Sequence, residues 1–195
     1  MLIIIENMIG THDSFTYLNP KKRVFNILSF LWKTQTKNIQ EQRSLGVKYF
    51  DIRVRYYKEK WILCHGLVDF DTIPFSTLED IMRFFNKSEY LRIILERVSK
   101  NEDIFKFKHD ILTLKEKYKN IVFSCIKRDW NIIINEDPHI IDYTYTPFLS
   151  NLSLWDNIKR MNFFSTIKKW AKKHNPTITE KIVGDKNTIH FLDYV

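Results

Sequence analysis

Short apolar runs of strand length recur along the chain and alternate with segments that have helical spacing. The runs occupy residues 2–5, 47–54, 61–64, 91–98, 121–126, 140–145 and 189–195. Residues 38–45 form a short helical pattern that Gly46 ends, and residues 101–118 carry an apolar stripe that Asn101 is placed to cap. Ser76 and Glu79 have the spacing of a capping box before a third helix. Strands that alternate with helices predict an α/β fold with a parallel sheet.

The number of apolar runs favours a barrel over an open sheet, because parallel strands are covered on both faces. We therefore predict a small, irregular (β/α)8-type TIM barrel that forms a single domain over residues 1–195. A full barrel of this kind has roughly 200 residues or more, so we expect abbreviated or missing helices. In such barrels the chemistry gathers at the carboxyl ends of the strands.

Composition narrows the class of partner without choosing one. The formal net charge is +8, which favours a polyanion such as nucleic acid, an anionic membrane surface or a phosphorylated substrate. The two cysteines are too few for a disulfide framework, and no Cys/His spacing suggests zinc. No signal peptide or transmembrane segment is visible, so we expect a soluble chain that is cytoplasmic or peripheral to a membrane.

Polar residues at the ends of the apolar runs predict a single site. His12 and Asp13 follow the first run, His65 follows the third, and Asp193 lies late in the last. In the run VKYFDIRV, strand alternation puts Asp51 and Arg53 on one face, and both are expected near the end of their strand. That pair alone is equally consistent with a structural ion pair. Two histidines and a guanidinium at one rim, however, are suited to phosphoryl transfer, with an imidazole to take a proton, another to give one, and an arginine to neutralise phosphoryl oxygens.

Three ordered motifs make the sequence resemble a known family. The motifs are GTHDS at residues 10–14, the pattern WKTQTKNIQEQRSLGVKYFDIRV at residues 32–54, and CHG at residues 64–66. Together they resemble the X-type catalytic domain of phosphatidylinositol-specific phospholipases C, in its bacterial, metal-independent form. The last run, IHFLDYV, is also similar to the final barrel strand of that family.

The resemblance implies a role for each residue of the predicted site. His12 corresponds to the general base for the inositol 2-hydroxyl, and Asp193 to the carboxylate that orients it. His65 corresponds to the general acid for the diacylglycerol oxygen, with Asp13 as its partner. Arg53 would hold the phosphate, and Asp51 would position either Arg53 or His12. The implied reaction gives inositol 1,2-cyclic phosphate and diacylglycerol. Gly10 is expected to turn the backbone sharply off the first strand and so deliver His12 and Asp13 together.

The resemblance also bears on metals and cofactors. Calcium-dependent relatives carry an acid where Arg53 stands and an asparagine where Asp13 stands. A fixed guanidinium supplies positive charge and repels a cation, so we expect no metal and no cofactor. Two other interpretations remain open: a catalytically silent module that binds inositol phospholipid, and a metal-dependent relative of the glycerophosphodiester phosphodiesterases.

Contacts to the substrate are predicted more loosely. Glu96 or Arg97 should point towards the site. The residues expected to contact phosphate or sugar are Arg97, Lys127, Arg128, Asp142 and Tyr145. The expected partner is phosphatidylinositol or a related phospholipid at a membrane surface. No nucleic-acid-binding motif is visible, and the sequence indicates no protein partner.

Overall fold

The computed structural model describes residues 9–72, 74–127, 129–133, 140–143, 171–172, 174–175 and 189–193. Within these residues the elements run in the order β1 (Ile9–Thr11), α1 (Val24–Ile27), a 3-10 turn (Ser29–Leu31), α2 (Ile39–Ser44), β2 (Tyr49–Tyr57), β3 (Lys60–His65), β4 (Val68–Asp69), α3 (Glu79–Met82), β5 (Tyr90–Arg97), α4 (Asn101–Lys117), β6 (Ile121–Ile126), β7 (Asp129–Ile133), β8 (Ile140–Tyr143) and β9 (Ile189–Leu192). The run predicted at residues 2–5 lies outside the described residues.

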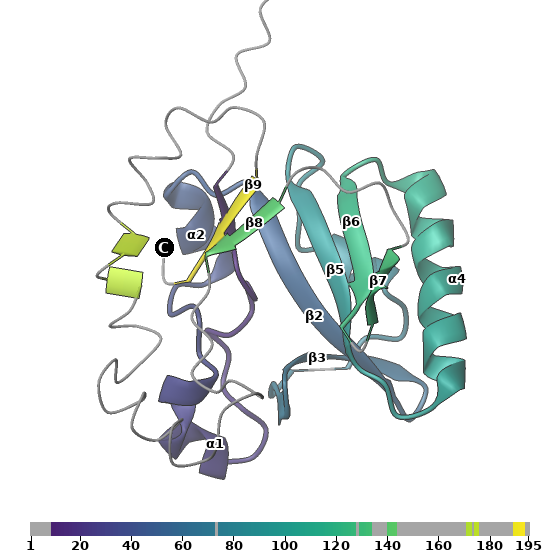
Figure 1. Ribbon diagram of the computed structural model, residues 1–195, viewed down its shortest axis with the longest axis horizontal. Coiled ribbons are helices and arrows are strands. Elements are labelled where there is room, and N and C mark those ends of the chain that lie inside the picture. The colour runs from purple at the N-terminus through teal and green to yellow at the C-terminus, as the bar shows by residue number, and fades with distance from the viewer. Residues whose placement is uncertain are drawn as a thin grey trace, which may run out of the picture.

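The sheet has the strand order of a barrel that is open on one side (Figure 1). Strands β6, β5, β2, β1, β9 and β8 lie side by side and run parallel. The first strand therefore pairs with the last, as in a closed (β/α) barrel. On the open side β7 pairs antiparallel with β6, and in the described part of the chain no strand joins it to β8. The prediction of a small, irregular barrel is confirmed.

One apolar run was assigned to the wrong kind of strand. Residues 61–64 were expected to form a parallel barrel strand, but β3 pairs antiparallel with β2 and then with β4. The tight turn between β2 and β3 contains Lys58 and Glu59, both with positive φ. A two-residue turn can join only antiparallel strands, because a parallel crossover needs a dozen or more residues. The hairpin extends β2 as far as Tyr57, so Asp51 and Arg53 lie within that strand and not at its end.

The apolar core lies on the outer face of the sheet, between the strands and the helices. On β2 the alternate residues Phe50, Ile52 and Val54 are fully buried in this core. Phe107 and Ile111 of α4 belong to the same core, and α4 lies beyond β5 and β6 in Figure 1. Each such side chain contributes about 1.5–3 kcal/mol on burial. None of the helices among the described residues is long and apolar enough to cross a bilayer.

Helix α2 begins and ends as predicted. Asn38 caps it through a hydrogen bond from the Glu41 amide, and Glu41 accepts one from the Asn38 amide in return. Gly46 follows the helix with a φ of 84°, a conformation that residues with a side chain rarely adopt. This short helix matters because it carries Gln42 to the site.

The other two caps differ from the prediction. The reciprocal bonds before α3 join Thr77 and Asp80, one residue later than the predicted pair of Ser76 and Glu79. Asn101 is the first residue of α4 and does not cap it. Instead the Asp103 carboxylate accepts hydrogen bonds from the Ser99 and Lys100 amides. In both cases an aspartate in the first turn satisfies the amide groups that precede the helix.

Candidate active site

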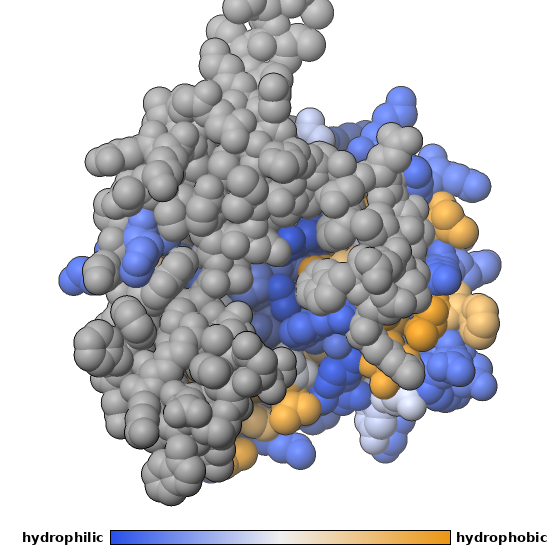
Figure 2. Space-filling model, in the orientation of Figure 1, coloured by the Kyte–Doolittle hydropathy of each residue, from blue (hydrophilic) through white to orange (hydrophobic). Residues whose placement is uncertain are grey.

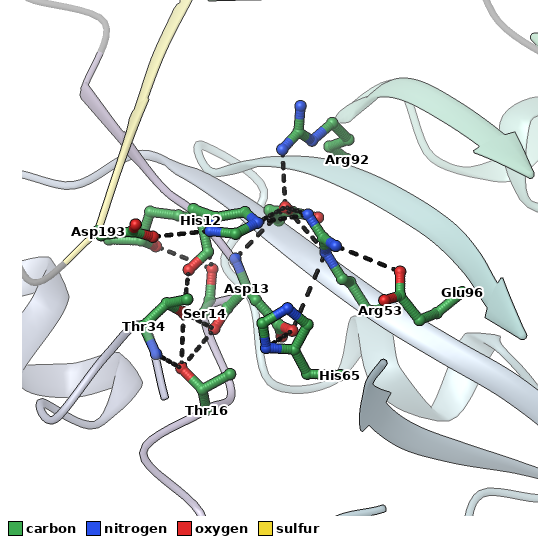
Figure 3. Close-up of polar contacts among 12 residues, drawn as sticks. His12, Asp13, Ser14, Thr16, Thr34, Arg53, His65, Arg92, Glu96 and Asp193 are labelled. Atoms are coloured by element: carbon green, nitrogen blue, oxygen red, sulfur yellow. Dashed lines mark hydrogen bonds and ion pairs between the residues drawn. The ribbon is translucent and has the colours of Figure 1, made fainter. Parts of the chain in front are cut away.

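A buried polar cluster occupies the inner face of the sheet, where the surface is hollowed and hydrophilic over β2 (Figure 2). Arg53 is at its centre (Figure 3). Its guanidinium lies 3.1 Å from Asp51, 3.2 Å from Glu96 and 3.9 Å from Asp13. Burial opposes its charge, but these three carboxylates outweigh burial and raise the pKa of Arg53. A permanent cation is therefore fixed at the centre of the cluster.

His12 lies between Arg53 and a carboxylate from the last strand. Its Nδ1 is 2.7 Å from Oδ1 of Asp193, which follows β9, and its Nε2 is 2.5 Å from the Arg53 guanidinium. Because a guanidinium can only donate, Nε2 is the acceptor and Nδ1–H donates to Asp193. Burial and the charge of Arg53 hold the pKa of His12 well below its usual value. The imidazole is therefore neutral, with its Nε2 lone pair directed to the Arg53 guanidinium.

The turn that presents His12 is made by its neighbour and not by Gly10. Gly10 lies within β1, where it pairs with Tyr49 of β2. Asp13 has a φ of 42°, a left-handed conformation in which non-glycine residues are uncommon. The expectation that Gly10 turns the chain is therefore wrong, because β1 continues to Thr11 and the backbone reverses beyond it.

His65 reaches the same place from the end of β3. The His12 and His65 rings are 5.8 Å apart, centre to centre, and nearly perpendicular. His65 Nδ1 is 2.6 Å from the backbone carbonyl of Trp32, to which its N–H donates. Asp13 Oδ2 is farther away, at 3.4 Å. Burial and Arg53 lower the pKa of His65 to about 4, so this imidazole is also neutral in the free protein.

Asp13 and Asp51 flank Arg53 but differ in their hydrogen bonds. Asp51 Oδ2 accepts from Arg53, from Arg92 and from the Asp13 amide. These cations outweigh the effect of burial and hold the pKa of Asp51 well below its usual value. Neither carboxylate oxygen of Asp13 accepts a hydrogen bond from a described residue, and burial raises its pKa well above the usual value.

Side chains of the second motif hold the loop that carries His12. Gln42 donates to the Ser14 carbonyl at 2.9 Å, and Gln35 donates to the His12 carbonyl at 3.2 Å. Thr34 also donates to the His12 carbonyl, and Thr16 donates to that of Asp13. The two glutamines belong to the quoted motif. Thr34 lies in the same motif and Thr16 precedes it. Neither threonine was singled out, because a buried threonine has no distinctive sequence pattern.

The structure places the residues that were expected to contact substrate in different surroundings. Glu96 faces Arg53, and Lys127 lies 2.5 Å from the Glu96 carboxylate. Arg97 is bonded to Asp69 of β4, together with Arg55. Arg128 and Tyr145 lie outside the described residues, as does the side chain of Asp142. Arg92, which sequence reasoning missed, donates to Asp51 at 2.7 Å.

Comparison with known proteins supports the resemblance drawn from the motifs. No protein-family model matches the chain. Over 97 residues, 44% of the chain, it is 34% identical to a PI-PLC X-box domain-containing protein of Dictyostelium discoideum. Over 120 residues, 62% of the chain, it is 26% identical to the 1-phosphatidylinositol phosphodiesterase of Listeria monocytogenes. These matches span 13% and 36% of the two relatives.

The fold is also that of a known enzyme. The phosphatidylinositol-specific phospholipase C from Listeria monocytogenes superposes with a TM-score of 0.59 over 96% of this chain and 88% of the other, at 15% identity. This similarity establishes the fold as a distorted, partial version of that barrel.

Proposed function

We propose that this chain is a metal-independent phosphatidylinositol-specific phospholipase C. The observation that carries the proposal is the pair of neutral imidazoles, His12 and His65, set 5.8 Å apart beside the buried guanidinium of Arg53. A phosphodiester bound to Arg53 would have a base on one side and an acid on the other. The sequence similarity to the Listeria phosphodiesterase supports the same substrate class.

In the proposed reaction His12 Nε2 takes the proton of the inositol 2-hydroxyl. The freed oxygen attacks phosphorus and forms the 1,2-cyclic ester, while the bond from phosphorus to the glycerol oxygen breaks. His65 gives its Nε2 proton to that oxygen, which leaves as diacylglycerol. Asp193 stabilises the imidazolium that forms on His12, since their atoms are 2.7 Å apart.

His65 must carry a second proton before it can act as the acid. Its pKa of about 4 in the free protein is too low for this at neutral pH. The negative charge of a bound phosphodiester would offset Arg53, which is one of the two main causes of the low value. Asp13, 3.4 Å from Nδ1, would add to the effect once ionised. Substrate binding is therefore expected to charge His65.

Phosphorus NMR of phosphatidylinositol vesicles in excess chelator tests the proposal. The wild-type protein is expected to produce a cyclic inositol phosphate resonance without added calcium. His12→Ala and His65→Ala should each lower the rate by about 10²–10⁴-fold. His109→Ala is the matched control, because His109 is exposed on α4, away from the site.

Two outcomes would contradict the proposal. Turnover that appears only with added divalent cation would indicate a metal-dependent relative. Vesicle binding without turnover in the wild-type protein would indicate a silent inositol-phospholipid-binding module.

We further propose that an apolar surface beside His65 docks on the membrane. Val24 and Ile27 of α1 are 56% and 79% exposed, and Leu67, two residues after His65, is 77% exposed. Trp32 connects these parts, since its indole donates to the Phe25 carbonyl and its own carbonyl accepts from His65. Residues 21–23 add the exposed sequence KKR. Exposed apolar and basic groups together favour an anionic lipid surface.

A pair of matched variants tests this surface. Ile27→Ser should lower turnover of phosphatidylinositol in vesicles but leave turnover of a monomeric short-chain analogue unchanged. Leu112→Ser is the control, since Leu112 is also exposed, at 53%, but lies on α4. Equal losses on both substrates, or an equal effect of Leu112→Ser on vesicles, would contradict the docking surface.

A further inference from the structure

Two of the carboxylates beside Arg53 are each paired with a second cation. Glu96 is 3.2 Å from Arg53 through one oxygen and 2.5 Å from Lys127 through the other. Asp51 is 3.1 Å from Arg53 and 2.7 Å from Arg92. Asp51 and Glu96 therefore share their negative charge between Arg53 and a second cation. Arg53 keeps part of its positive charge uncompensated by these two acids, and this charge can attract an anionic phosphodiester.

The position of Arg92 in the sheet makes its pairing with Asp51 specific. It is directly opposite Asp51 in the β2–β5 ladder, and it is only 2% exposed. The desolvation cost of burying a guanidinium can exceed its Coulombic gain, and an apolar residue of similar volume is often as stable. Stability alone therefore does not explain an arginine at position 92. The need to pair the negative charge of Asp51, which lies next to Arg53, does explain it.

We propose that Arg92 is a positioning residue that binds Asp51 and so leaves the Arg53 guanidinium available to the phosphodiester of the substrate. This inference rests on the proposed function. Without Arg92, Asp51 would have Arg53 as its only guanidinium partner among the described residues, and Arg53 would be held more tightly in that ion pair. The substrate would then have to compete with Asp51 for the same donors.

The same arrangement affects the protonation of His12. The charged and titratable groups around His12 and its partner Arg53 come from several elements, and they are Asp13, Asp51, Arg53, His65, Arg92, Glu96, Lys127 and Asp193. Of these, Arg92 disfavours the imidazolium and Asp51 favours it. Removing the positive charge of Arg92 should therefore make His12 easier to protonate, which a purely structural role would not do.

The test compares Arg92→Gln, which removes the charge, with Arg92→Lys, which keeps it at shorter reach. Arg92→Gln should lower kcat/KM on phosphatidylinositol vesicles by about 10- to 100-fold, chiefly through KM. The NMR titration midpoint of His12, assigned from the signal missing in His12→Ala, should move to higher pH. Arg92→Lys should show a smaller change of the same sign in both measurements.

Arg43→Met is the matched control. Arg43 makes an ion pair with Glu89 at 2.5 Å but lies on α2, outside the site. It should lower the free energy of unfolding and leave both the His12 midpoint and kcat/KM unchanged. If Arg92→Gln does not fold, the folded Arg92→Lys variant tests the proposal by the direction in which its His12 midpoint and its kcat/KM change.

The proposal is overturned if the folded Arg92 variants lose stability but keep the wild-type His12 midpoint and kcat/KM. Its failure differs from failure of the proposed function. A wild-type protein that does not cleave phosphatidylinositol would refute the proposed function, whereas the His12 titration would still test the effect of Arg92.

Discussion

The two histidines of the site are held by different kinds of partner. On the His12 side, Asp193 accepts from Nδ1 and Arg53 donates to Nε2, while Arg92 donates to Oδ2 of Asp51. On the His65 side, Nδ1 donates to a backbone carbonyl. The nearby Asp13 carboxyl accepts no hydrogen bond from a described residue.

This contrast indicates that the free protein holds His12, but not His65, in the state that the proposed reaction requires. The His12 side is charge-paired before substrate arrives, so its neutral imidazole is already oriented in the free protein. The His65 side retains a buried carboxyl without donors and an imidazole with a pKa of about 4. A buried carboxyl without donors costs stability. Asp13 would gain a charged partner only when His65 is protonated, which substrate binding is expected to favour.

The largest expected effect on turnover comes from Asp193→Asn, which changes the partner of His12 Nδ1. An amide N–H facing Nδ1 would favour the wrong tautomer and place the ring proton on Nε2. Turnover should fall by about 10²–10⁴-fold with little loss of structure. Initial rates and circular dichroism check this, with the exposed Asp71→Asn as control. Wild-type turnover in Asp193→Asn would mean that the two sides do not differ as described.

Gln42→Leu should weaken both sides together, because Gln42 holds the loop that carries both His12 and Asp13. Its buried amide bonds the Ser14 carbonyl at 2.9 Å and the Lys37 carbonyl at 2.7 Å. The free energy of unfolding should fall by about 1–3 kcal/mol, measured by urea titration. Gln40→Leu on the exposed face of α2 is the control, and an equal loss there would show that the loop contacts contribute nothing.

Acid should destabilise the protein through its neutral histidines. The pKa of His65 is about 4 when folded and about 6.5 when unfolded, so the unfolded chain binds the proton first. This contribution is complete above pH 6.5 and is lost as the pH falls to about 4, at a cost on the order of 2–3 kcal/mol. Urea titrations across this range should show a shallower loss in His65→Asn. His109→Asn should retain the wild-type slope.

The smallest expected effect is a gain in stability from Asp13→Asn, at the expense of turnover. The raised pKa of Asp13 means that the unfolded chain loses its proton first, so ionisation destabilises the folded state as the pH rises. The variant should be about 1 kcal/mol more stable than wild type at pH 8, with a smaller difference at pH 4. Asp51→Asn should do the reverse and lose stability. A destabilised Asp13→Asn would contradict the account of the His65 side.

Local patterns explain what could be predicted. The alternation of VKYFDIRV fixed the shared face of Asp51 and Arg53, and the helical pattern that Gly46 ends fixed the extent of α2. Both depend only on residues within a few positions of one another, where backbone geometry dictates which side chains meet. The motif resemblance added the remote partner, and the structure brings His12 and Asp193 within 2.7 Å although they are 181 residues apart.

The sequence by itself determined the barrel class, the inner face of β2 and the residue types of the candidate site. Only the tertiary structure decided that β3 turns back on β2, that a Trp32 carbonyl receives His65, and that Arg92 binds Asp51. A backbone carbonyl carries no side-chain identity, and Arg92 within an apolar run has no sequence signal of its partner. Their roles arise because packing removes water from charged groups, so that each must find a partner among whichever strands the fold brings together.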